Sequence, residues 1–232
     1  MEVLESIVSY VEYRKDNNYI CQNQQEAIGM LHNYCTSIDR PTDLKEVDWT
    51  FFDKFLIYWL PKNQKDLSEK EFQQVLNVVL GYCDYIRNNH DIKILFTSEA
   101  ENYYRRECIR IQRLKELFLQ HFGYPILAVD PLVIDLEDYK KYKSRRNIKK
   151  QDGIYQQGLF QVDEIEYDNT LVLKNISKGN LVRVALVGYI VTSMREGDIL
   201  HLRIKHKQFF TCWEIIDFKN CYLQNASEYL SW

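Results

Sequence analysis

The spacing of apolar residues changes once along the chain, from a helical repeat in the first half to strict alternation after Gly158. In one long segment of the first half, Phe72, Val75 and Leu76 recur at spacings of three and four, which places them on one face of an amphipathic helix. After Gly158, apolar and polar residues alternate in short runs, as in half-buried strands. A chain that separates the two repeats in this way is predicted to be α+β, with a helical bundle followed by a small antiparallel β domain.

Two helices of the first half have recognisable starts. Ser68 and Glu71 have the Ser-x-x-Glu spacing of a capping box, in which each side chain accepts a hydrogen bond from the other residue's backbone N–H. Ser98 and Glu101 predict the same start for a second helix, which should end near Gly123. With a central apolar helix and two shorter amphipathic stripes, they make up an expected bundle of about five helices, the stripes lying at residues 3–11 and 27–35.

The central helix is predicted from DWTFFDKFLIYWLP, residues 48–61, which is apolar on nearly every side. A segment of this kind packs among other helices instead of covering one face of them. Pro61 is expected to stop it, because the proline ring clashes with the preceding turn and has no N–H to donate.

The segment TFFDKFLIYWLPKNQKDLSEKEFQQVLNVVLGYCDYI resembles the helical, SAM-like core-binding domain of phage-type tyrosine recombinases. The resemblance covers roughly residues 45–90 and consists of an aromatic-rich helix, a polar connection and a capped helix packing at a right angle. It implies a module of the kind that grips duplex DNA. After residue 150 the chain has no H-x-x-R box followed by a nucleophilic tyrosine in a helical context, so the resemblance does not extend to recombinase chemistry.

Five short strands are expected in the second half, separated by turn residues that tolerate a left-handed backbone, such as Asn169 and Gly179. Closure into a small barrel, SH3-like or OB-like, would remove exposed strand edges. The expected domains are a helical (SAM-like) domain of residues 1–125, a basic linker of residues 126–153, and a barrel domain of residues 154–232 that ends in a short helix.

The strongest charge feature is the junction YKKYKSRRNIKKQDG, whose seven cations at residues 140–150 are not interrupted by an acid. Such a run attracts phosphates through counterion release, and its tyrosines offer surfaces for base stacking. The alternative is a solvated linker that offsets the acidic residues just before it. The candidate nucleic-acid contacts of this basic junction are Lys140, Lys141, Lys143, Arg145, Arg146, Lys149 and Lys150.

The strand ILHLRIKH has a second cationic set. Its inward residues are expected to be Leu200, Leu202 and Ile204, which leaves His201, Arg203 and Lys205 together on the opposite face. OB-like barrels bind single strands on such a face, but basic residues on an exposed strand also limit aggregation. Both interpretations stay open on the sequence.

Composition and motifs exclude several classes of function. A net charge of −3 argues against a surface built entirely for nucleic acid. The six cysteines include no CxxC pair, which predicts buried free thiols and a cytoplasmic location. The chain has no leading apolar run, so we predict no membrane contact. No P-loop, GxGxxG, GxSxG, HExxH or zinc pattern occurs, and the five histidines are isolated. We therefore predict no catalytic residues, cofactor or metal.

The sequence favours a non-catalytic, two-module binding or adaptor protein that contacts DNA or RNA through the basic junction. The alternative is a protein–protein interaction or regulatory subunit without a nucleic-acid role. An enzyme with an unrecognised site is a third reading, because catalytic groups are often distant in sequence.

Overall fold

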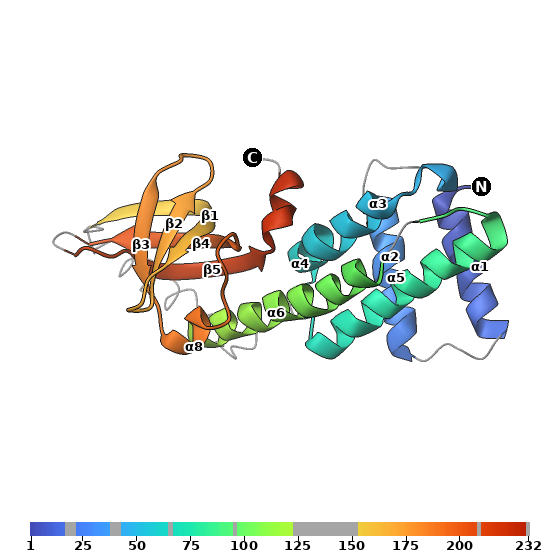
Figure 1. Cartoon of the computed structure of the whole chain (residues 1–232), viewed down its shortest axis with the longest axis horizontal. Coiled ribbons are helices and arrows are strands. Elements are labelled where there is room, and N and C mark those ends of the chain that lie inside the picture. Colours follow the sequence, from blue (N-terminus) through green and yellow to red (C-terminus); the bar gives the residue numbers. More distant parts are fainter. Residues whose placement is uncertain are drawn as a thin grey trace, which may run out of the picture. The chain divides into compact units, whose positions relative to one another are not determined.

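The computed structural model describes residues 1–16, 22–37, 43–64, 67–94, 97–122, 153–207 and 210–230. The chain forms two compact units (Figure 1). The helical unit comprises Met1–Leu114 together with Asn220–Trp232, and the β unit comprises Lys115–Lys219. Helices that precede an antiparallel sheet confirm the α+β class. Among the described helices, none is both long enough and apolar enough to cross a membrane.

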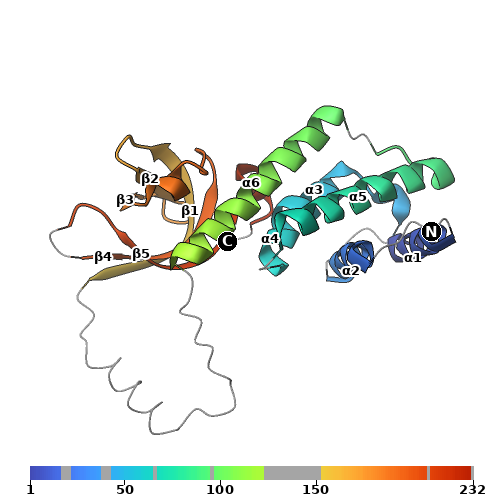
Figure 2. The same ribbon diagram turned by 90° about the horizontal axis from the view of Figure 1, so that it is seen from below.

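The helical unit is built around its long fifth helix. Ahead of the sheet the chain forms α1 (Val3–Asp16), α2 (Gln22–Ser37), α3 (Trp49–Lys54), α4 (Leu60–Asn63), α5 (Glu69–His90) and α6 (Ser98–Phe122). A short 3₁₀ turn, η1 (Leu44–Glu46), precedes α3. Helices α1 and α2 pack against each other and both contact α5 (Figure 2). The apolar face predicted for α5 is buried, with Phe72, Leu76 and Val79 fully inaccessible to solvent.

The start of α5 has the predicted capping box. The Ser68 hydroxyl accepts from the Glu71 N–H, and the Glu71 carboxylate accepts from the Ser68 N–H at 2.7 Å. Hydrogen bonds from Ser68 hold the pKa of Glu71 below its ordinary value. Helix α6 begins at Ser98, and its capping residue is Thr97 instead of the predicted Ser98. The Thr97 hydroxyl accepts from the Ala100 N–H at 3.2 Å.

The prediction that the central helix stops at Pro61 is wrong. After α3 the backbone passes through a π-helical turn, η2 (Phe55–Trp59), and continues into α4, which contains Pro61. The Leu60 N–H bonds to the carbonyl of Phe55, five residues earlier, so the turn before Pro61 is wider than an α-turn. A wider turn relieves the clash between the proline ring and the preceding carbonyl. The expected helix of residues 48–61 therefore appears as α3 and α4.

The β unit is a five-stranded antiparallel sheet in the order β3-β2-β1-β4-β5. Strand β1 pairs with β4 along its first part, where Gly158 faces Leu202, and with β2 along its last part, where Val162 faces Leu173. The register shifts after Val162, as at a β-bulge, which bends a strand and lets β1 serve both neighbours. The elements are β1 (Ile154–Ile165), β2 (Thr170–Asn175), β3 (Leu181–Ala185), the short helix α8 (Gly188–Val191), β4 (Ile199–His206) and β5 (Glu214–Tyr222).

The sheet is not closed into the barrel that we expected. Strands β3 and β5 lie at the two ends of the strand order. A parallel bridge joins Val184 of β3 to Trp213, just before β5, and the Trp213 N–H donates to the carbonyl of Arg183 at 2.7 Å. Closure requires a continuous ladder between the end strands, and an isolated bridge does not supply one. The turns behave as predicted, with Asn169 and Gly179 at φ values of 65° and 71°.

The C-terminal segment, Asn220–Trp232, groups with the helical unit. Its short helix is a 3₁₀ turn, η3 (Gln224–Glu228), whose capping position is Leu223 and not the predicted Asn225. Two contacts hold this segment on the central helix. The Tyr229 hydroxyl donates to Asp53 Oδ2 at 2.8 Å, and Asn220 Nδ2 donates to the carbonyl of Pro61.

Candidate functional site

Seven of the ten candidate contact residues lie outside the described part of the chain. They are the members of the basic junction, Lys140, Lys141, Lys143, Arg145, Arg146, Lys149 and Lys150. The other three, His201, Arg203 and Lys205, stand on β4.

Strand β4 shows the predicted division between its two faces. Leu200, Leu202 and Ile204 are fully buried in the core of the sheet, whereas Arg203 is exposed and Lys205 is partly exposed. The two cations are two residues apart, so their side chains leave the same face of the strand.

A tyrosine from β1 brings these two cations together. Tyr155 lies opposite Lys205 in the ladder between β1 and β4. The Tyr155 ring centroid is 5.3 Å from Lys205 Nζ and 5.5 Å from Arg203 Cζ, both within the range of a cation–π interaction. We call Tyr155, Arg203 and Lys205 the Tyr155 cluster. The sequence pattern did not reveal it, because the first strand was expected to begin only at Gly158.

His201 does not add charge to this face. It is half-buried, and burial lowers the pKa of its imidazole, with a further lowering by the nearby Lys219 ammonium that outweighs the opposite effect of Asp217. An imidazole with a pKa below its ordinary value of 6.5 is neutral at pH 7. The positive charge that we predicted for three residues therefore comes from Arg203 and Lys205.

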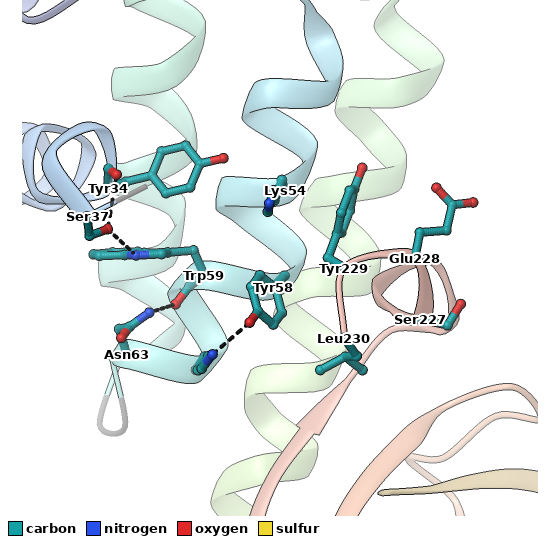
Figure 3. A pocket seen from close by; sticks show the side chains of 11 residues that line it. Tyr34, Ser37, Lys54, Tyr58, Trp59, Asn63, Ser227, Glu228, Tyr229 and Leu230 are labelled. Carbon is teal, nitrogen blue, oxygen red and sulfur yellow. Dashed lines mark hydrogen bonds between the residues drawn. The ribbon is translucent and has the colours of Figure 1, made fainter. Parts of the chain in front are cut away.

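The helical unit contains a cavity of about 640 Å³ that no sequence pattern predicted (Figure 3). Its walls come from α2, from the continuous segment α3–η2–α4, and from η3 and the residues after it in the C-terminal segment. The lining residues are Tyr34, Ser37, Lys54, Tyr58, Trp59, Lys62, Asn63, Ser227, Glu228, Tyr229 and Leu230. We call this cavity the aromatic pocket.

Hydrogen bonds hold the polar ends of three aromatic side chains in the pocket. Trp59 Nε1 donates to Ser37 Oγ at 2.9 Å, and the Tyr34 hydroxyl donates to the carbonyl of Phe51 at 3.0 Å. The Tyr229 hydroxyl donates to Asp53, as described above. Burial and the hydrogen bond to Asp53 raise the pKa of Tyr229, so this phenol stays protonated and uncharged. These bonds fix the orientations of the Trp59 and Tyr229 rings, which are partly exposed, whereas the Tyr34 ring is buried against Trp59.

Two lysines supply positive charge at the same pocket. Lys54, Tyr58 and Lys62 follow one another at four-residue spacing along the central helix. Lys62 Nζ donates to the Tyr58 hydroxyl at 2.7 Å, and Lys54 Nζ is 5.8 Å from the Tyr229 ring centroid. Figure 3 shows Lys54 and Tyr58 between the Tyr34–Trp59 side and the Tyr229 side of the pocket. Glu228 is the one acidic residue in the lining.

The described lining of the pocket contains no histidine and no cysteine. Within the described ranges, no group of three or more histidine, cysteine, aspartate or glutamate residues is placed to hold a metal ion. Both surfaces combine aromatic rings with cations.

Comparison with protein-family models, with curated proteins and with solved structures gives no match to this chain. The likeness of residues 45–90 to the core-binding domains of recombinases therefore stays a prediction.

Proposed function

We propose that the chain is a non-catalytic, two-module binding protein whose β unit contacts single-stranded DNA or RNA. The observation that carries this proposal is the Tyr155 cluster, in which two cations lie within 5.5 Å of one aromatic ring on the outward face of β1 and β4. Single-stranded nucleic acid is bound by this combination, because cations attract the phosphates and an aromatic ring stacks on an unpaired base.

The basic junction supports the same assignment through its place in the chain. Lys150 is five residues before Tyr155. A fully extended chain spans at most about 3.6 Å per residue, so covalent connection alone keeps the two Cα atoms within about 18 Å. A single nucleic-acid strand that contacts the Tyr155 cluster would therefore also lie within reach of the last cations of the basic junction.

The strand arrangement favours an OB-like fold among the two barrels that we considered. An OB-like barrel has five strands and is only partly closed, and binding of oligonucleotides is common among such domains. Five strands in this order, with a parallel bridge between Val184 and Trp213, are compatible with partial closure. The likeness of the helical unit to a recombinase core-binding domain gives the second module, which we propose contacts duplex DNA.

The test is a fluorescence-anisotropy titration of labelled single-stranded DNA, single-stranded RNA and duplex DNA with the full chain. One variant, Arg203→Ser with Lys205→Ser, removes the charge of the cluster. A second changes Lys140, Lys141, Lys143, Arg145 and Arg146 to Ser. We expect each variant to weaken binding of the single strands. For a pair of lost phosphate contacts, the slope of log K against log salt concentration should fall by about 1.4.

The matched control is Lys174→Ser with Lys178→Ser, which removes two exposed cations from the same unit without touching the cluster. We expect this variant to bind like the wild type. Absence of binding to any of the three probes at low salt would overturn the nucleic-acid assignment. Equal weakening by the control would show that only the total charge matters.

The alternative, a protein-interaction or regulatory subunit, is favoured by exposed apolar side chains on the β unit. Ile154 and Phe210 are each 64% exposed and Leu181, on the end strand β3, is 57% exposed. Contact with another protein chain would remove these apolar side chains from water. Self-association in light scattering, or a co-purified protein that survives both high salt and nuclease, would favour this function over the first.

A further inference from the structure

We propose that the aromatic pocket of the helical unit binds a nucleotide, with the base against the aromatic rings and the phosphate bound by Lys54 and Lys62. The site goes beyond the proposed function, since its residues all belong to the helical unit and it needs neither the Tyr155 cluster nor the basic junction.

The dimensions of the pocket fit a small ligand. A volume of about 640 Å³ lies within the range of about 300–1,000 Å³ that is typical of sites for small molecules and cofactors. Four of the lining residues are aromatic, namely Tyr34, Tyr58, Trp59 and Tyr229. The partly exposed rings of Tyr58, Trp59 and Tyr229 make up the apolar body that such sites use for affinity, and a few polar groups orient the ligand.

The rings are prepared for a planar ligand. The indole N–H of Trp59 and the hydroxyls of Tyr34 and Tyr229 are already hydrogen-bonded to protein atoms, so a ligand does not have to satisfy them. Trp59 and Tyr229 are partly exposed and offer ring surface, which stacks on any base. Tyr34 is only 1% exposed and packs against Trp59, so it supports the Trp59 ring and does not meet a ligand itself. Pre-oriented rings also lose little conformational entropy when a ligand binds.

The charges of the lining distinguish a nucleotide from other ligands. The described lining contains two lysines and one glutamate, and a second acid, Asp53, accepts a hydrogen bond from Tyr229. A neutral sugar would use the rings but not the lysines, and a simple anion would use the lysines but not the rings. A nucleotide uses both, because it joins a flat base to a phosphate. The Glu228 carboxylate and Asn63 Oδ1 are then placed to accept from the hydroxyls of the sugar, while Asn63 Nδ2 donates to the Trp59 carbonyl.

The π-helical turn lies in the part of the central helix that lines this pocket. Residues 55–59 form the turn, and its last two members, Tyr58 and Trp59, both line the cavity. Lys54, just before the turn, and Lys62, after it, line the same cavity. Single π-turns of this kind occur frequently at functional sites.

The experiment is isothermal titration calorimetry of the full chain with AMP, adenosine and inorganic phosphate, together with a single-stranded hexanucleotide. The test variant is Lys54→Gln with Lys62→Gln, and the matched control is Lys70→Gln with Lys93→Gln, two exposed lysines of the same unit. We expect AMP to bind more tightly than adenosine or phosphate alone. Loss of charge-assisted contacts should raise the Kd for AMP at least about tenfold in the test variant. The control should leave it unchanged.

The probes distinguish a free nucleotide from a nucleotide within a strand. Saturable binding of AMP that is lost in the test variant supports a site for the free nucleotide. Binding of the hexanucleotide alone, lost in the same variant, supports capture of a nucleotide from a strand. The inference is overturned if neither probe binds, or if the test variant binds both as the wild type does. The Arg203→Ser, Lys205→Ser variant should bind AMP as the wild type does. This result distinguishes a failure of the nucleotide site from a failure of the proposed nucleic-acid function of the β unit.

Discussion

Asn220 is the residue whose loss we expect to loosen the C-terminal segment from the central helix. Its side chain is 5% exposed and forms three hydrogen bonds. Nδ2 donates to the carbonyl of Pro61 and to the Tyr222 hydroxyl, and Oδ1 accepts from the backbone N–H of Cys221 at 3.0 Å. The substitution Asn220→Ala removes all three bonds at once.

A hydrogen bond between neutral groups contributes about 0.5–1.5 kcal/mol net, so the three together give a loss of about 1.5–4.5 kcal/mol in the free energy of unfolding. The assay is equilibrium unfolding in urea, followed by tryptophan fluorescence and far-ultraviolet circular dichroism. With a slope of about 2 kcal/mol per molar, the midpoint should fall by about 1–2 M.

The control is Asn225→Ala, because Asn225 is exposed in η3 of the same unit. It should shift the midpoint by less than about 0.25 M, the effect of an ordinary surface change of about 0.5 kcal/mol. If Asn220→Ala behaves like this control, the side chain of Asn220 does not fasten the segment, and the reasoning from its hydrogen bonds fails.

Two further predictions concern the capping box and the half-buried histidine. Ser68→Ala should lower stability by about 1 kcal/mol in the same urea assay. Because Ser68 lowers the pKa of Glu71 in the folded state, the stability from this pair is present above about pH 4.5 and lost as the pH falls, and the variant should lack this acid-dependent loss. His201 has a folded-state pKa below the ordinary value of 6.5, chiefly through burial. The unfolded chain therefore binds the proton more readily, and stability falls as the pH drops from 7 toward 5. His201→Gln should flatten this part of the pH profile, and an unchanged profile would contradict the assignment.

Much of the architecture follows from local patterns that the sequence displays directly. The apolar spacing of α5 predicted its buried face, and Ser68 with Glu71 predicted its first residue, because a capping box involves only neighbours in the chain. The alternation in β4 likewise predicted which side chains enter the core. These features need no knowledge of distant segments.

Other features were missed because they depend on partners far away in the sequence. Pro61 reads as a helix stop, but a π-turn carries the helix past it, and Asn220 donates to the Pro61 carbonyl from 159 residues away. The short C-terminal turn reads as part of the β domain, yet its Tyr229 bonds to Asp53. No local sequence pattern predicts either contact.

The sequence by itself determined the α+β fold class, the capping box that starts α5, and which side chains of α5 and β4 enter the core, since these depend on the spacing of apolar residues and on neighbouring residues. Only the tertiary structure decided that the five strands form an open sheet, that Tyr155 joins Arg203 and Lys205, and that the aromatic pocket exists. The physical reason is the distance along the chain. Residues 34, 59 and 229 meet in one cavity only after packing has brought α2, the central helix and the C-terminal segment together, and packing of that range has no local signature.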